Sequence, residues 1–319
     1  MTDDNTRPNI KLFSLNSNRE LAEKISKAVG VPLGKATTKK FSDDEIKISV
    51  DESIRGTEVY VIQSISDPVN TNLMELLIMV DALRRASAGS INVVIPYYGY
   101  SRADRKARSR EPITAKLLSS FLEMDGVDRV VTLDLHADQI QGFFDIPVDH
   151  LRAARLLAKF FESKHGKDDL VIISPDHASV SRARTFAELL DAPIAIIDNR
   201  SPEDANTIPE SVIGDVEGKR AVVVDDMIDT AIKTQIASET LKKAGASEVY
   251  AVATHAIFSG DAVKRLEEAP IKNVIVTDSI KLSDEHKFDK LELVSVDKLF
   301  GEAINLIHNQ QSVGKLFGR

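Results

Sequence analysis

Residues 222–231 read VVVDDMIDTA, an apolar run that ends in adjacent carboxylates and a short polar turn. Three consecutive valines favour a buried strand. Ligands of parallel α/β sheets bind beyond the carboxyl ends of the strands, often at the start of a helix that attracts phosphate. We therefore predict a ligand site that includes Asp225, Asp226 and Asp229. The alternative is an acidic N-cap on an ordinary helix, which needs only one acid.

Short apolar runs alternate with longer amphipathic stretches along the rest of the chain. VYVIQS at 59–64 precedes the helix-like NLMELLIMVDALRRAS, and LVIIS at 170–174 opens a second series of the same kind. This alternation predicts an α/β fold with mostly parallel sheets flanked by helices. Because the series occurs twice, we expect two similar α/β domains that meet near residues 145–155.

Composition narrows the class of protein. The chain has 319 residues, a formal charge of -8 and a pI near 5.5, which argues against general nucleic-acid or membrane binding. The absence of cysteine excludes disulfides and thiolate chemistry. The polar start lacks the apolar core of a signal peptide, and no apolar run reaches the roughly 18 residues of a membrane span. We expect a cytoplasmic protein.

Two further motifs carry charged side chains that suit a divalent cation and a polyphosphate. Asp134, His136 and Asp138 alternate, so at a strand end they would share one face and suit a divalent cation. A lone histidine is, however, more often a structural hydrogen-bonding residue. Residues 102–110 hold five cations against a single anion, which suits a polyphosphate. A nucleic-acid patch or a solvated face would look the same.

Two polar segments have either a ligand-binding role or no role beyond that of an ordinary surface turn or loop. In KKFSDDEIKI, Phe41 could stack on a base while Asp43 and Glu45 accept its amino hydrogens. FSDDE alone is also a common exposed turn. NRSPEDANTIP, at 199–209, reads as a loop, which is either functional or an ordinary surface connection.

Taken together, four stretches closely resemble the ribose-phosphate pyrophosphokinases: NLMELLIMVDALRRASA, RKARSREPITAKL, DLHADQIQGFFDIPVDHL and VVVDDMIDTA. The resemblance extends from about Ile10 to Phe317. It implies two phosphoribosyltransferase-like domains. Residues 1–148 would form the ATP side, completed by a C-terminal helix within 297–319, and residues 149–296 the ribose 5-phosphate side. It also implies Mg²⁺ and transfer of a diphosphoryl group from ATP to the C1 hydroxyl of ribose 5-phosphate, with AMP leaving.

The resemblance also implies the site residues. ATP would be bound by Arg102 and Ala103 and, from a neighbouring subunit of a symmetric oligomer that is typically a hexamer, by Phe41, Asp43, Asp44 and Glu45. Magnesium would be held by His136 and Asp176. Ribose 5-phosphate would be bound by Asp225, Asp226, Asp229, Thr230, Ala231, Ile232 and Lys233.

Several departures from the family pattern fall on these ligand loops. Asn199 stands at the family's catalytic lysine and Ser201 at its arginine, so only Arg200 of that cluster remains. Ile232 and Lys233 replace the glycine and threonine of the sugar-phosphate turn, and a β-branched residue would not accept a glycine's positive φ. Ala178 and Ser179 replace glycines, and Ala103 replaces a glutamine. Loss of one such cation or donor is worth roughly a thousandfold in rate.

Three hypotheses follow. The chain is an active synthase, with Lys233 supplying charge that the loop has lost. Alternatively, it is a catalytically impaired paralogue that serves as a regulatory or structural subunit of a competent synthase in a hetero-oligomer. A phosphoribosyltransferase that acts on a base is a third possibility, but it gives the motifs of the first domain no role.

Overall fold

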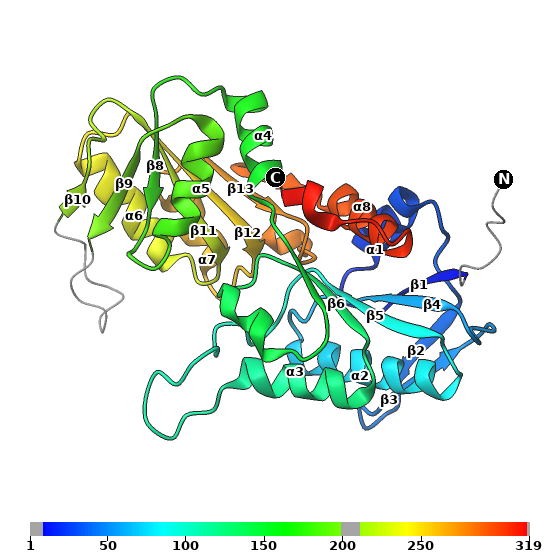
Figure 1. Cartoon of the computed structure of the whole chain (residues 1–319). Helices are drawn as coiled ribbons and strands as arrows, with labels where there is room; N and C mark the ends of the chain where they lie inside the picture. The colour runs from blue at the N-terminus through cyan, green and yellow to red at the C-terminus, as the bar shows by residue number, and fades with distance from the viewer. Residues whose placement is uncertain (1–8, 199–210, 318–319) are drawn as a thin grey trace, which may run out of the picture. The chain divides into compact units, whose positions relative to one another are not determined.

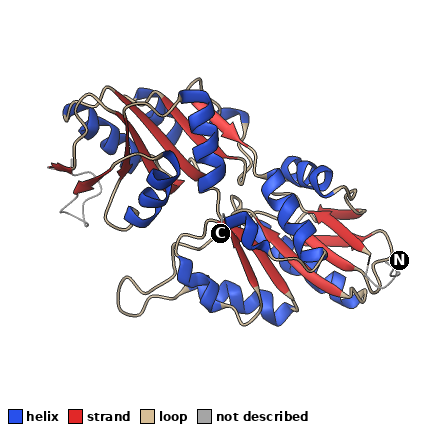
Figure 2. Ribbon diagram, turned by 45° about the horizontal axis from the view of Figure 1, so that its top comes forward, coloured by secondary structure: helices blue, strands red, loops and turns tan. Residues whose placement is uncertain are grey.

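The computed structural model describes residues 9–198 and 211–317 (Figure 1). Asn199, Arg200 and Ser201 lie outside the described residues. The chain forms two compact units. Unit 1 comprises Met1–Arg152, Ser279–Lys281 and Val296–Arg319, and unit 2 comprises Ala153–Asp278 and Leu282–Ser295. In each unit, helices flank a mostly parallel sheet (Figure 2), which confirms the predicted fold class.

The sheet of unit 1 has five strands in the order β1-β4-β5-β6-β7, and every neighbouring pair is parallel. The central strand reads SINVVI, with five of its six residues buried. Such near-continuous apolar strands are typical of parallel sheets covered on both faces. The strands are β1 (Ile10–Ser14), β4 (Glu58–Ile62), β5 (Ser90–Ile95), β6 (Arg129–Leu133) and β7 (Val148–Leu151).

Helices cover both faces of this sheet. Figure 1 shows α2 (Val69–Arg85) and α3 (Thr114–Asp125) on one face, and α1 (Arg19–Val29) and α8 (Asp297–His308) on the other. A separate antiparallel hairpin pairs β2 (Ala36–Lys40) with β3 (Ile46–Val50). Two 3₁₀ helices complete the unit: η1 (Asp138–Phe143) and η3 (Val313–Phe317).

The last helix of the chain, α8, packs on α1 within unit 1. Phe300, Ala303 and Ile304 of α8 are fully buried. A Cβ atom at Gly301 would lie only 2.5 Å from the Cβ of Ala28 on α1. Glycine at this position therefore sets how closely the two helices approach.

The sheet of unit 2 has seven strands in the order β10-β9-β8-β11-β12-β13-β14. Neighbouring strands in this sheet are parallel, except that the edge strand β10 runs antiparallel to β9. The strands are β8 (Leu170–Ser174), β9 (Ile194–Asp198), β10 (Ser211–Ile213), β11 (Arg220–Ile228), β12 (Glu248–Ala256), β13 (Asn273–Thr277) and β14 (Leu291–Val294).

Four helices pack on this second sheet. One core joins apolar residues of α6 (Ile232–Lys243) and α7 (Ala262–Glu268) to the central strands. The other two, α4 (Ala154–His165) and α5 (Val180–Leu190), contact each other, and α5 packs on β8 and β11. A short 3₁₀ helix, η2 (Asp284–His286), precedes β14. The loops that follow β8 and β11 thus leave the sheet at one edge, because the two strands are adjacent and parallel.

Candidate functional site

The carboxyl ends of β8 and β11 bring three acidic side chains of unit 2 together. Asp176 lies two residues after the end of β8, whereas Asp225 and Asp226 lie in the second half of β11. The hydroxyl of Ser179 donates to Asp225 Oδ1 at 3.1 Å, and its backbone N–H donates to Asp176 Oδ1 at 2.8 Å. Ser179 therefore joins the two loops.

Two cations face this group of acids. Lys233 Nζ donates to Asp176 Oδ2 at 2.8 Å and to Asp225 Oδ2 at 2.9 Å. Arg182, on the first turn of α5, places its NH1 atom 3.8 Å from Asp225 Oδ1 and 3.7 Å from Asp226 Oδ1. The sequence had singled out Lys233 but not Arg182, which belongs to an unremarkable amphipathic helix. We call Asp176, Asp225, Asp226, Arg182 and Lys233 the β8–β11 charge cluster.

Burial and oppositely charged neighbours shift the pKa values of these groups in opposite directions. Burial, together with the neighbouring Asp226, raises the pKa of Asp225 above its ordinary value. Burial also acts to raise the pKa of Asp176, but Lys233 and Ser179 outweigh it and leave that pKa lowered. For Lys233, burial favours the neutral amine, yet the two carboxylates dominate and raise its pKa. The lysine is therefore a cation at neutral pH.

The turn from β11 into α6 forms the second part of the site. Ala231 has a left-handed φ of 60°, and α6 begins at the next residue, with no side-chain cap among the described residues. The expectation that Ile232 would have to adopt a positive φ is wrong, because Ala231 takes that conformation and Ile232 is helical. Thr230 is exposed, and its carbonyl accepts from Arg265 NH1 at 2.9 Å. Backbone N–H groups at such a helix start suit a phosphate.

Asp229 lies between the charge cluster and this turn. Its side chain is partly buried, and its carbonyl accepts from Ser259 N at 3.0 Å, which fixes the turn to the segment after β12. Of the seven residues predicted to bind the sugar phosphate, all lie within the continuous segment from Asp225 to Lys233. The structure describes every one of them.

In unit 1, the segment after β6 differs from its predicted geometry. The strand ends at Leu133, Asp134 has a left-handed φ of 35°, and Asp138 begins η1. The expectation that Asp134, His136 and Asp138 share one strand face is therefore wrong. Arg152 forms ion pairs with Asp134 and Asp138. Its NH2 lies 2.8 Å from Asp138 Oδ1, and its NH1 lies 3.9 Å from Asp134 Oδ1. His136 is exposed.

The loop between β5 and α3 holds the predicted ATP-phosphate residues of unit 1. Two backbone hydrogen bonds hold Ala103. Its N–H donates to Tyr100 O at 2.9 Å, and its carbonyl accepts from Ala115 N at 3.2 Å. Asp104 accepts from Gln139 of η1 at 2.9 Å. These bonds anchor the start of the loop. The five cations of the segment are all exposed: Arg102, Arg105, Lys106, Arg108 and Arg110.

The tip of the β2–β3 hairpin carries Phe41, Asp43, Asp44 and Glu45, all of which are exposed. Phe41 N donates to Glu45 O at 2.8 Å, and Asp44 has a left-handed φ of 68°. The Phe41 side chain is 53% exposed. An aromatic ring exposed at a hairpin tip is available to a ligand or to another chain.

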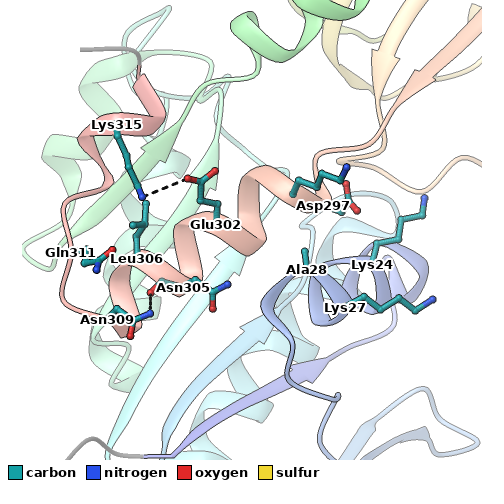
Figure 3. Close-up of a pocket in the computed structure, with 11 residues that line it drawn as sticks. Lys24, Lys27, Ala28, Asp297, Glu302, Asn305, Leu306, Asn309, Gln311 and Lys315 are labelled. Atoms are coloured by element: carbon teal, nitrogen blue, oxygen red, sulfur yellow. Dashed lines mark hydrogen bonds and ion pairs between the residues drawn. The ribbon is translucent and has the colours of Figure 1, made fainter. Parts of the chain in front are cut away.

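A separate cavity of about 630 Å³ lies along α1 and α8 in unit 1 (Figure 3). Lysines gather around it: Lys24, Lys27, Lys298 and Lys315. None of the residues that the sequence predicted for ATP, sugar phosphate or metal lines this cavity. The cavity is therefore separate from the predicted substrate and metal sites.

Two kinds of feature are absent from the described residues. Among them, no three or more His, Asp or Glu side chains converge as a group that could hold a metal ion on its own. No described helix has both the length and the apolar character needed to cross a membrane.

An α/β scaffold whose strand ends carry carboxylates beside a helix start is chemically suited to a ligand that has both hydroxyl and phosphate groups. Comparison with known proteins makes the class definite. The N-terminal domain of ribose phosphate pyrophosphokinase matches residues 10–126, and the phosphoribosyl synthetase-associated domain matches residues 204–318. Individual relatives agree with both matches.

Ribose-phosphate pyrophosphokinase 2 of Enterococcus faecalis is 59% identical over 312 residues, which cover 97% of this chain and 96% of that protein. Ribose-phosphate pyrophosphokinase 1 of Listeria monocytogenes is 57% identical over 310 residues, or 97% and 98% of the two chains. The crystal structure of phosphoribosylpyrophosphate synthetase from Mycobacterium smegmatis superposes with a TM-score of 0.90 at 39% identity, covering 95% of this chain and 99% of that one. The chain belongs to the ribose-phosphate pyrophosphokinase family, which is a family of transferases.

Proposed function

We propose that this protein transfers the diphosphoryl group of ATP to the C1 hydroxyl of ribose 5-phosphate, which gives phosphoribosyl diphosphate and AMP. The observation that carries the proposal is the segment from Asp225 to Lys233, which joins strand-end carboxylates to the uncapped start of α6. Family membership supplies the reaction, and this segment supplies a site with the right chemistry for its sugar substrate.

The sugar phosphate has two kinds of group to satisfy. Carboxylates accept hydrogen bonds from sugar hydroxyls, and we assign this role to Asp225, Asp226 and Asp229. The backbone N–H groups from Thr230 to Lys233, together with the Thr230 hydroxyl, are suited to the 5-phosphate. Residues 149–296 would thus form the ribose 5-phosphate side of the enzyme.

ATP would be bound by the other domain, residues 1–148 with the C-terminal segment 297–319. Arg102 and the neighbouring cations can neutralise the triphosphate, with Ala103 at the anchored start of their loop. Phe41 can stack on adenine, while Asp43, Asp44 and Glu45 accept hydrogen bonds. Because the four residues of the hairpin tip are exposed, we assign it to the ATP site of a neighbouring subunit in a homo-oligomer, which we propose to be a hexamer.

Magnesium is part of the proposal, and its fit differs between the two predicted ligands. When bound with ATP, Mg²⁺ neutralises charge on the phosphate oxygens, and it typically needs only one or two protein ligands besides them. His136 is exposed after β6 and fits this role. Asp176 does not fit as placed, since its Oδ1 accepts from Ser179 N and its Oδ2 from Lys233 Nζ.

In the reaction, the C1 hydroxyl oxygen forms a bond to the β-phosphorus of ATP. The bond from that phosphorus to the oxygen that stays with AMP breaks, and the hydroxyl proton is released. The protein's work is orientation and charge neutralisation.

Asn199, Arg200 and Ser201, at the family's catalytic positions, lie outside the described residues. We propose that the enzyme acts in the cytoplasm on small-molecule substrates, without nucleic acid or membrane partners.

The test is AMP formation by the purified protein with Mg-ATP, in the presence and absence of ribose 5-phosphate. We expect AMP only when the sugar phosphate is present. Asp229→Asn should lower the rate about 10- to 100-fold, because hydrogen bonds to a charged group are worth about 1.5–3 kcal/mol. Glu188→Gln removes one charge from an exposed position on α5 and should leave the rate unchanged. The proposal would be refuted if AMP formed at the same rate without ribose 5-phosphate, or if Asp229→Asn left the rate of AMP formation unchanged.

A further inference from the structure

Lys233 converges on two carboxylates that come from different loops. Asp176 belongs to the segment after β8, and Asp225 belongs to β11. The ammonium lies 2.8 Å from Asp176 Oδ2 and 2.9 Å from Asp225 Oδ2. One nitrogen therefore satisfies an oxygen of each acid.

The other oxygens of these acids are already used. Asp176 Oδ1 accepts from the Ser179 N–H at 2.8 Å. Asp225 Oδ1 accepts from Ser179 Oγ at 3.1 Å and from the Asp226 N–H at 3.0 Å. Only the two Oδ2 atoms point to a shared position, and Lys233 Nζ occupies it.

That position needs positive charge. Asp225 and Asp226 are adjacent in the chain, Asp225 is largely buried, and Arg182 approaches their Oδ1 atoms only at 3.7–3.8 Å. Unpaired carboxylates at such a site would be costly. A divalent cation is one solution, because oxygen ligands from carboxylates are what Mg²⁺ prefers. A lysine is another, and this chain carries one at the second residue of α6.

We propose that Lys233 is a built-in cation of the β8–β11 charge cluster and takes the position between Asp176 and Asp225 that a divalent ion would otherwise fill. The protein free of substrates then binds no divalent ion at Asp176. A divalent ion could enter only by displacing an ammonium that is tethered to the same helix turn and cannot diffuse away.

The inference deepens the proposed function, on which it rests for the meaning of the site. It adds a dual role for one side chain. The Lys233 side chain is 53% exposed, and the residue lies in the first turn of α6, where the 5-phosphate is proposed to bind. The same ammonium can therefore hold the carboxylates and face an incoming anion.

The test measures Mn²⁺ binding by electron paramagnetic resonance and by calorimetry, with no nucleotide or sugar present. Four proteins are compared with the wild type: Lys233→Thr, Lys233→Gln, Lys233→Thr with Asp176→Asn, and Lys243→Thr. Lys243 is an exposed lysine near the far end of α6 and provides a control with the same loss of charge. Gln keeps a hydrogen-bond donor, so it retains the fold should threonine destabilise the turn. Circular dichroism checks folding in each case.

We expect Lys233→Thr and Lys233→Gln to bind one Mn²⁺ at least tenfold more tightly than the wild type and Lys243→Thr do. Adding Asp176→Asn should abolish the gain. Equal Mn²⁺ stoichiometry and affinity in all five proteins would overturn the proposal. So would a Mn²⁺ site that the wild type already has and that the variant with both Lys233→Thr and Asp176→Asn lacks. Because no substrate is used, either failure is separate from failure of the AMP-release assay.

Discussion

At the scale of single residues, unit 2 contains a carboxyl group whose pKa several hydrogen-bond donors lower together. Glu248, at the start of β12, accepts hydrogen bonds from Lys272, from Tyr250 Oη at 2.7 Å and from Arg220 Nε at 3.1 Å. These donors, Lys272 first, lower the pKa of Glu248 from 4.5 to about 2. The folded state therefore holds the carboxylate ionised where the unfolded chain would bind a proton.

The resulting pH dependence has a definite sign. A carboxylate with a lowered pKa contributes stability that is fully present above its unfolded pKa and is lost as pH falls toward its folded pKa. We predict that the free energy of unfolding contains a Glu248 contribution that declines between pH 4.5 and about 2. Denaturant titrations across this range should show a smaller decline for Glu248→Gln than for the wild type. Parallel curves for the two proteins would contradict the prediction.

The same scale shows what sequence can predict about a site. Acids at the end of VVVDDMIDTA were placed at a strand end from the sequence, and β11 carries two of them there. The conformations of single residues were not predictable. The positive φ fell on Ala231 rather than Ile232, and Asp134 left the strand in a left-handed conformation. Both backbone conformations depend on tertiary packing, which the local sequence does not specify. The position of Arg182 beside Asp225 and Asp226 depends on tertiary packing as well.

At the scale of elements, α8 is a helix that completes unit 1 from the far end of the chain. Its buried stripe includes Phe300, which has no exposed surface, and its close contact with α1 depends on Gly301. Removal of a large side chain from such a contact costs both its transfer free energy and the cavity left behind.

We predict that Phe300→Ala lowers the free energy of unfolding of unit 1 by about 3–5 kcal/mol. Lys298→Ala, an exposed position on the same helix, should change it by less than about 0.5 kcal/mol. Chemical denaturation, followed by circular dichroism, measures both. If the two variants unfold at the same denaturant concentration, α8 does not stabilise unit 1 as described.

Elements were more predictable from sequence than residues. VYVIQS and LVIIS correspond to β4 and β8, because central parallel strands are apolar along their whole length. The edge elements gave no comparable pattern. The four residues of β7, VDHL, are half polar, and the three residues of β10 are partly exposed. Strands that are short and paired on one side need less apolar sequence, so periodicity alone misses them.

At the scale of the whole molecule, the proposed oligomer makes each ATP site depend on two chains. If Phe41 serves the neighbouring subunit while Asp229 serves its own, then inactive variants at the two positions should complement each other. Symmetric assemblies allow such sharing because every interface repeats.

We predict that Phe41→Ala and Asp229→Asn are each strongly impaired, and that oligomers assembled from equal amounts of both regain about a quarter of wild-type activity, as random pairing of subunits requires. Coexpression with two affinity tags would supply the mixed oligomers, and light scattering would confirm their mass. Mixed oligomers with no more activity than the single variants would place Phe41 outside a neighbour's site.

The central claim is that the group transferred is the diphosphoryl unit of ATP and that ribose 5-phosphate receives it. The most direct measurement follows ATP radiolabelled at the β-phosphorus, and in a parallel reaction at the α-phosphorus, with products separated by chromatography. We predict that the β label moves to the sugar phosphate while the α label remains in AMP. Formation of ADP, or an α label on the sugar, would contradict the account.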